Sequence, residues 1–146
     1  MQLRVSDFLI ALAALLGTPV VLGVTFGCAI VNAFGSIGPV DIIFGSLANL
    51  IAASLVMLLR KHKLVACIVG AMPIGIIVGG GYLWLWYPYH PNQLAFLPAW
   101  STTLISITIS SLIAVGLLGY LVLQTLSRPA IIRPLKSRGL KVLTED

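Results

Sequence analysis

The sequence predicts an all-α protein, a polytopic bundle of transmembrane helices, from its composition and from the length of its apolar runs. Hydrophobic residues make up 59% of the 146 residues and charged residues 9%, whereas a soluble domain is roughly a quarter charged and under half apolar. The mean hydropathy is +1.07. The apolar runs lack the alternation of apolar and polar residues that strands of a membrane barrel show. We therefore expect helices that cross a bilayer.

Five apolar stretches, separated by proline, glycine or basic residues, cover residues 5–17, 19–35, 40–59, 64–86 and 97–127. The first has about 13 residues and rises about 20 Å as a helix. A hydrocarbon core is about 30 Å thick, so we do not expect this stretch to span alone. We expect a membrane-embedded bundle over residues 1–127 and a basic tail over residues 128–146.

The placement of basic residues predicts the orientation. Arg60, Lys61 and Lys63 lie between the third and fourth stretches, and five more follow the fifth: Arg128, Arg133, Lys136, Arg138 and Lys141. Lysine and arginine favour the cytoplasmic side, and two crossings separate the two groups. We expect a multi-pass protein of the cell membrane with a cytoplasmic C-terminus. Five aromatic residues then predict a girdle at the outer interface: Tyr82, Trp84, Trp86, Tyr87 and Tyr89.

Polar side chains within apolar stretches are the candidates for function, because they are costly in hydrocarbon and usually face a partner or a cavity. They are Arg4, Asp7, Asn32, Asp41, Asn49 and the hydroxyl row Thr103, Ser106 and Ser110. Each also has a purely structural interpretation. Asp41 follows Gly38-Pro39 and could be a helix N-cap, as could Ser6-Asp7. The two asparagines could join helices by hydrogen bonds, and the hydroxyl row favours close helix packing.

The sequence does not favour catalysis. It has no Ser/His/Asp set, no paired carboxylates on one helix face and no cluster of metal ligands. Gly79-Gly-Gly81 lacks the lysine of a phosphate-binding loop, and we expect it to thin its helix where another backbone comes close. Cys28 and Cys67 are expected to be small buried hydrophobes. We expect no enzymatic activity, no cofactor and no metal, which leaves transport or binding as the default function.

Three motifs carry a resemblance to a known family. They are Gln2-Leu-Arg-Val-Ser-Asp7, Thr25-Phe-Gly-Cys-Ala-Ile-Val-Asn32 and Gly38-Pro-Val-Asp-Ile-Ile-Phe-Gly-Ser-Leu-Ala-Asn49. Over residues 2–60 the chain closely resembles the QueT family. Its members are substrate-specificity (S) components of energy-coupling factor (ECF) transporters, linked to uptake of queuosine precursors.

The resemblance implies a six-helix bundle that binds a 7-deazaguanine from outside and docks on one transmembrane scaffold with two ATPases. Arg4 and Asp7, Asn32, and Asp41 with Gly45 fall on three elements of the family's pattern. Two departures matter. The family's first helix, which should precede Arg4 and which commonly contacts the scaffold through small residues, is absent, so we expect a span to be missing. The carboxylate expected on the last helix near Ser110 is also absent.

The implied ligand suggests a role for each polar residue. A deazaguanine presents a flat face, two adjacent N–H donors and a carbonyl acceptor. We expect Asp7 or Asp41 to accept from the N1 and exocyclic amine donors, because charge-assisted bidentate bonds are strong. Asn32, Asn49 or Arg4 would donate to the carbonyl oxygen, and a ring would stack on the base: Tyr82, Trp84 or Trp86. The predicted substrate-binding residues are Arg4, Asp7, Asn32, Asp41, Asn49 and Trp84.

Two alternatives stay open at this point. One is an ECF S component for another vitamin or nucleobase, since motif similarity fixes the family better than its ligand. The other is a non-transporting membrane partner whose basic tail docks on anionic lipid or on a soluble protein. The girdle tryptophans have a structural alternative as well, because such residues commonly serve only as an interfacial belt.

Overall fold

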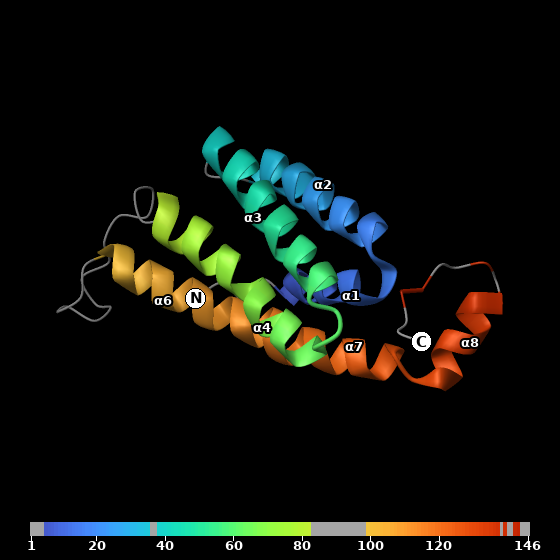
Figure 1. Cartoon of the computed structure of the whole chain (residues 1–146). Helices are drawn as coiled ribbons and strands as arrows, with labels where there is room; N and C mark the ends of the chain where they lie inside the picture. The colour runs from blue at the N-terminus through green and yellow to red at the C-terminus, as the bar shows by residue number, and fades with distance from the viewer. Residues whose placement is uncertain (1–4, 36–37, 83–98, 138, 140–141, 144–146) are drawn as a thin grey trace.

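The computed structural model describes residues 5–35, 38–82, 99–137, 139 and 142–143. Its described residues fold into helices, which confirms the all-α prediction (Figure 1). In chain order the elements are η1 (Val5–Leu12), α1 (Ala13–Leu16), α2 (Thr18–Gly35), α3 (Pro39–Leu58), α4 (Lys63–Pro73), η2 (Ile74–Tyr82), α6 (Ala99–Ser111), η3 (Leu112–Gly119), α7 (Tyr120–Leu126) and α8 (Pro129–Ser137).

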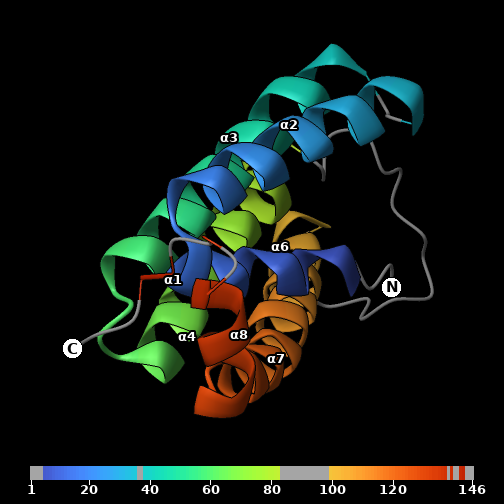
Figure 2. The ribbon, with the colours of Figure 1, turned by 90° about the vertical axis from the view of Figure 1, so that its right-hand side faces the viewer.

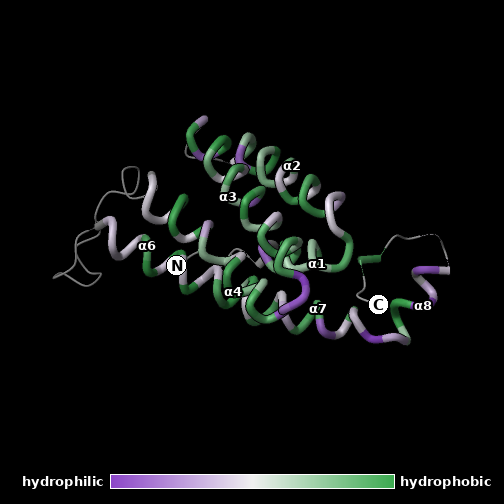
Figure 3. Tube along the Cα trace, in the orientation of Figure 1, coloured by the Kyte–Doolittle hydropathy of each residue, from purple (hydrophilic) through white to green (hydrophobic). Residues whose placement is uncertain are grey.

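Within the described residues, four helices are long and apolar enough to cross a membrane, which confirms the polytopic bundle. They are Thr18–Gly35, Pro39–Leu58, Lys63–Gly81 and Trp100–Leu126. The third joins α4 to η2, and the fourth joins α6, η3 and α7. Figure 3 shows apolar residues along all four, with hydrophilic residues at the turn between α3 and α4 and in α8. The predicted apolar stretches therefore correspond to the observed helices.

The first apolar stretch forms a short helix that is packed inside the bundle. Its apolar part, Asp7–Leu16, has 10 residues and is too short to span. A 3₁₀ segment, η1, leads into α1, and the helix ends at Gly17, whose φ of 69° suits glycine. Figure 2 shows this helix between the α2–α3 pair and the long α6–η3–α7 helix. A Cβ added at Gly119 of η3 would lie 2.8 Å from the Cβ of Ala11.

Small residues allow the neighbouring helices to approach closely. Helix α3, which packs against α4, carries three fully buried alanines: Ala48, Ala52 and Ala53. At Gly70 of α4 an added Cβ would contact the Val56 side chain and lie 3.3 Å from the Ala52 carbonyl oxygen. Such close backbones are typical of helix pairs in membranes, where packing rather than water exclusion drives association.

The glycines of η2 form a second close contact, with α6. A Cβ added at Gly79 would lie 3.0 Å from the Leu104 Cα and 3.1 Å from the Thr103 carbonyl oxygen. The prediction that Gly79-Gly-Gly81 thins the helix beside another backbone is confirmed at Gly79, whereas Gly80 meets the Leu104 side chain. η2 is a π-helix that begins directly after Pro73. Proline has no N–H to donate, so the helix lacks one backbone hydrogen bond at the point where α-helix changes to π-helix.

The hydroxyl row is only partly explained by packing. Thr103 lies at the contact with Gly79 through its carbonyl group, and Ser110 is buried. The hydroxyl that contacts a glycine of η2 belongs to Thr108, which touches Gly75 and lies outside the predicted row. The predicted row therefore lies on the helix that packs against η2, but it does not include Thr108, the residue at the closest contact between the two helices.

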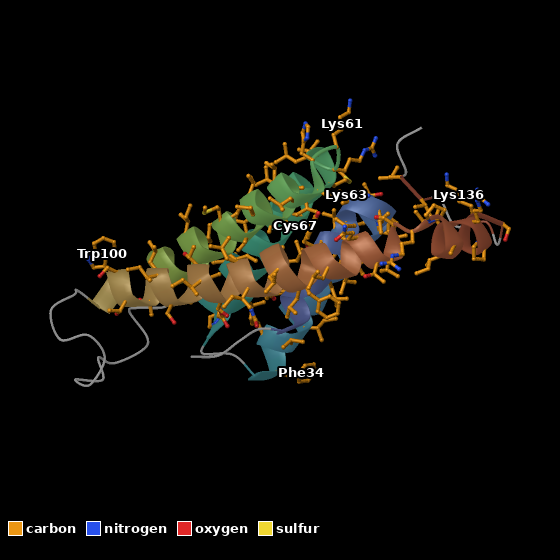
Figure 4. The ribbon with its side chains drawn as sticks, turned by 90° about the horizontal axis from the view of Figure 1, so that it is seen from below. Phe34, Lys61, Lys63, Cys67, Trp100 and Lys136 are labelled. Carbon is orange, nitrogen blue, oxygen red and sulfur yellow. The ribbon has the colours of Figure 1, made fainter. Side chains whose placement is uncertain are left out.

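The C-terminal segment folds back on the bundle. Ile132 of α8 is buried and belongs to the core. The Leu143 N–H donates to the Leu15 carbonyl oxygen at 2.7 Å, which satisfies a carbonyl at the end of α1. Figure 4 shows Lys61, Lys63 and Lys136 toward one part of the molecule, away from Trp100. The basic turn and the basic tail therefore lie on the same side, as two crossings between them require.

Candidate functional site

Two of the predicted site residues meet where α2 ends and α3 begins. Asn32 lies in the last turn of α2, and Asp41 lies in the first turn of α3. The two helices pack side by side along much of their length (Figure 1). Only residues 36–38 separate them, so the hairpin brings the last turn of one helix against the first turn of the next.

The Asn32 side chain makes a contact between the two helices. Its amide nitrogen Nδ2 donates to the main-chain oxygen of Asp41 at 3.0 Å and lies 3.6 Å from the sulfur of Cys28. Asn32 is 6% exposed and Asp41 is 4% exposed. A buried amide must be paired to avoid a desolvation cost, and here the pairing also fixes which way the amide faces.

Gly45 provides the space for this arrangement. It lies one turn after Asp41 on α3, and an added Cβ would lie 2.7 Å from Asn32 Nδ2. The same Cβ would lie 3.6 Å from Asp41 Oδ1 and 3.7 Å from Cys28 Sγ. We refer to Cys28, Asn32, Asp41 and Gly45 as the polar cluster. Its four residues come from two of the three sequence motifs.

Asp41 is not a helix N-cap, so that interpretation was wrong. The N-cap of α3 is Gly38, which makes no side-chain capping bond, and Pro39 follows it within the first turn. Proline fits there because the first helical N–H groups have no partner in the helix. Asp41 lies within the first turn, where a carboxylate is favoured by the helix dipole. Ser6-Asp7 does not start the first helix either, because η1 begins at Val5.

Two further predicted residues are buried elsewhere in the bundle. Asn49 is 8% exposed and lies on α3 two turns beyond Asp41, a rise of about 12 Å. Asp7 is 7% exposed and comes from η1, which packs against α2, α3 and η3. Both residues therefore lie in the interior of the bundle, whereas Asn32 is hydrogen-bonded directly to Asp41.

The other predicted site residues lie outside the described residues. These are Arg4 and Trp84, together with the girdle residues Trp86, Tyr87 and Tyr89. For Tyr82 only the backbone is described, at the end of η2. Their proposed roles therefore stay predictions.

Cys28 was wrongly expected to be a buried hydrophobe, whereas Cys67 meets that expectation. Cys67 is fully buried in the core, but Cys28 is half-buried and its sulfur accepts from Asn32. The signal was present in the sequence, because Cys28 and Asn32 are four residues apart and such residues are neighbours on a helix. It was missed because a cysteine in an apolar run usually acts as a small apolar residue.

The polar cluster places hydrogen-bonding groups in apolar surroundings. It combines a carboxylate, an amide and a sulfur among apolar helices, where hydrogen bonds are stronger than in water. Across the residues that the structure describes, no three His, Cys, Asp or Glu side chains come together as metal ligands.

Comparison with known proteins supports a transporter. A family model described as QueT transporter matches residues 1–128 of the chain. No curated protein and no solved structure matches it. The matched range includes the polar cluster and all four long apolar helices. The chain therefore belongs to the QueT transporter family.

Proposed function

We propose that this chain is the substrate-binding component of an ECF importer and that it takes up a queuosine or archaeosine precursor, a 7-deazaguanine. One observation carries the proposal: Asn32 and Asp41, which stand on separate family motifs, are buried in contact with each other at the end of a transmembrane hairpin. This contact brings an amide and a carboxylate residue from two family motifs to one point of the bundle.

The chemistry of the polar cluster supports a solute with N–H donors. Asp41 lies one turn before Gly45, and its Oδ1 would lie 3.6 Å from a Cβ added at that glycine. A carboxylate there can accept two parallel N–H bonds from the guanidine-like edge of a deazaguanine, and bidentate bonds of this kind are strong and directional. Asp7 and Asn49 supply further buried polar groups in the same bundle. Arg4 and Trp84 complete the proposed set.

Calorimetry with the purified protein tests the binding function. We expect 7-deazaguanine, or its 7-aminomethyl derivative, to bind the wild type, and Asp41→Ala to weaken binding about 10- to 100-fold. Hydrogen bonds to a charged group contribute roughly 1.5–3 kcal/mol, and 1.4 kcal/mol is tenfold. Asp7→Ala is expected to weaken binding as well. If both variants bind like the wild type, the recognition scheme is wrong.

The same titration separates the proposed ligand from its alternatives. If the wild type binds no deazaguanine but binds another nucleobase or vitamin, the proposed role as an S component stands. Only the identity of the solute then changes. Binding of no small solute, together with recruitment of anionic lipid or a soluble protein by the basic tail, would favour a non-transporting partner. Family membership makes this last alternative the weaker one.

Docking on an energy-coupling module is the second part of the proposal. The chain should copurify with one transmembrane scaffold and two ATPases when these are coexpressed. α2 offers lipid-facing apolar surface, because only 11% of that helix is buried. Solute binding without any such copurification would support binding and contradict the importer role of the chain.

A further inference from the structure

The orientation of the Asn32 amide determines what this residue can offer to a solute. An asparagine side chain has two N–H donors and one carbonyl oxygen. Nδ2 faces the Asp41 main-chain oxygen at 3.0 Å and the Cys28 sulfur at 3.6 Å. The opposite amide orientation would set two acceptor oxygens against each other, so the hydrogen-bond network decides the assignment. Both donors therefore have partners within the protein.

The amide oxygen is the part of Asn32 that remains available. Within the described part of the chain, the side chain of Asn32 hydrogen-bonds to Asp41 and to Cys28, and both bonds go through its nitrogen. The residue as a whole is 6% exposed, so its side chain is buried. A buried acceptor without a partner is costly, and a bound solute with an N–H group would remove that cost.

We infer that Asn32 accepts a hydrogen bond from the solute, so that Asn32 and Asp41 together read an edge that carries N–H donors. This inference rests on the proposed function and replaces the expectation that Asn32 donates to the carbonyl of the solute. In a 7-deazaguanine, the Asp41 carboxylate accepts from N1–H and from one N–H of the exocyclic amine. The second N–H of that amine goes to the Asn32 oxygen.

Gly45 and Cys28 are positioning residues in this scheme. A side chain at residue 45 would meet Asn32 Nδ2 at 2.7 Å and displace the amide. Cys28 engages the amide hydrogen that Asp41 does not. Each residue acts by holding the Asn32 oxygen in one direction.

A cycle that combines protein variants with ligand analogues tests the inference. The probes are 7-deazaguanine, its analogue without the exocyclic amine, and its 6-thio analogue, which weakens only the acceptor at that position. The variants are wild type, Asn32→Leu and, as a matched control, Thr25→Val. Thr25 lies on the same helix one turn before Cys28, and its hydroxyl donates to the Val21 carbonyl oxygen at 2.7 Å, in the preceding turn.

We expect the wild type to bind 7-deazaguanine at least tenfold more tightly than the analogue without the amine. Asn32→Leu should lower this ratio at least threefold without abolishing it, because the amine keeps its bond to Asp41, and should leave the ratio for the 6-thio analogue unchanged. Thr25→Val should preserve both ratios. The opposite pattern, in which Asn32→Leu removes only the 6-thio preference, would show that Asn32 donates. Unchanged ratios in Asn32→Leu would also overturn the inference.

A measurement on the wild type alone covers the case in which Asn32→Leu does not fold. In 7-deazaxanthine a carbonyl replaces the amine and would face the oxygens of Asn32 and Asp41. We expect it to bind at least 100-fold more weakly than 7-deazaguanine, and equal affinities would overturn the inference. A wild type that binds none of these probes would instead contradict the proposed deazaguanine function.

Discussion

Gly45 shows how a residue without a side chain determines the chemistry of its neighbours. It lies against Asn32, Asp41 and Cys28, and the nearest of their atoms would be 2.7 Å from an added Cβ. Glycine in the interior of a helix costs roughly 1 kcal/mol relative to alanine. The space that it leaves allows the Asn32 amide to reach across from α2 to the backbone of α3.

Gly45→Ala is expected to weaken 7-deazaguanine binding at least tenfold. The new methyl group displaces Asn32 Nδ2, so the bond to Asp41 breaks and the amide oxygen loses its direction. Calorimetry measures the affinity. Gly27→Ala is the matched control, because it lies on α2 with nothing within 4 Å of an added Cβ, and it should bind like the wild type.

Sequence reasoning identified the members of the site one at a time but not their arrangement. Asn32 and Asp41 stood out because polar groups are costly in apolar segments. That they touch depends on the hairpin between α2 and α3, and that the contact uses the main chain of Asp41 depends on where α3 begins. Residue types alone show neither the contact nor its use of the main chain. They also do not show that α3 begins before Asp41, so the sequence allowed Asp41 to be interpreted as an N-cap.

At the scale of the elements, the sequence predicts where helices form, but it does not predict where they depart from regular α-helix. Lengths and breakers located every long apolar helix to within a few residues. The π-helices η2 and η3 and the 3₁₀ helix η1 were not predicted, because such departures depend on contacts with neighbouring helices. Pro73 was the one local signal, since it removes a helix hydrogen bond at the start of η2.

Gly79→Ala is expected to destabilise the protein by roughly 1–3 kcal/mol, the range for overpacking a tight contact. Its Cβ would lie 3.0 Å from the Leu104 Cα, and a backbone atom cannot move aside as a side chain can. Thermal unfolding in detergent measures the effect. The matched control is Gly81→Ala, where the nearest atom is the Ile76 oxygen at 3.9 Å. Equal melting temperatures for the two variants would contradict the proposed contact.

At the scale of the whole molecule, α2 lies at the rim of the bundle. It is 11% buried, against 44% for Lys63–Gly81. Phe34 is 91% exposed and projects from the molecule in Figure 4. The outward face of α2 is exposed and apolar, whereas Asn32 lies on the face toward α3. One helix therefore joins the proposed solute site to the surface that a partner can reach.

The orientation of the whole molecule is a separate prediction. With both native cysteines replaced by alanine, a cysteine at Ser137 in α8 should react with an impermeant thiol reagent from the cytoplasmic side only. The positive-inside rule sets this expectation. Labelling from the outer side would reverse the topology and place the polar cluster on the wrong half of the membrane for import.

Protection of the Cys28 thiol by solute tests the central claim most directly, because its sulfur lies within the polar cluster. In a Cys67→Ala background Cys28 is the sole cysteine, so the rate of its modification by a small thiosulfonate can be followed alone. A solute held by Asn32 and Asp41 should slow this reaction at least fivefold at saturation. An unchanged rate, at a 7-deazaguanine concentration that calorimetry shows to be saturating, would place the solute elsewhere and contradict the account.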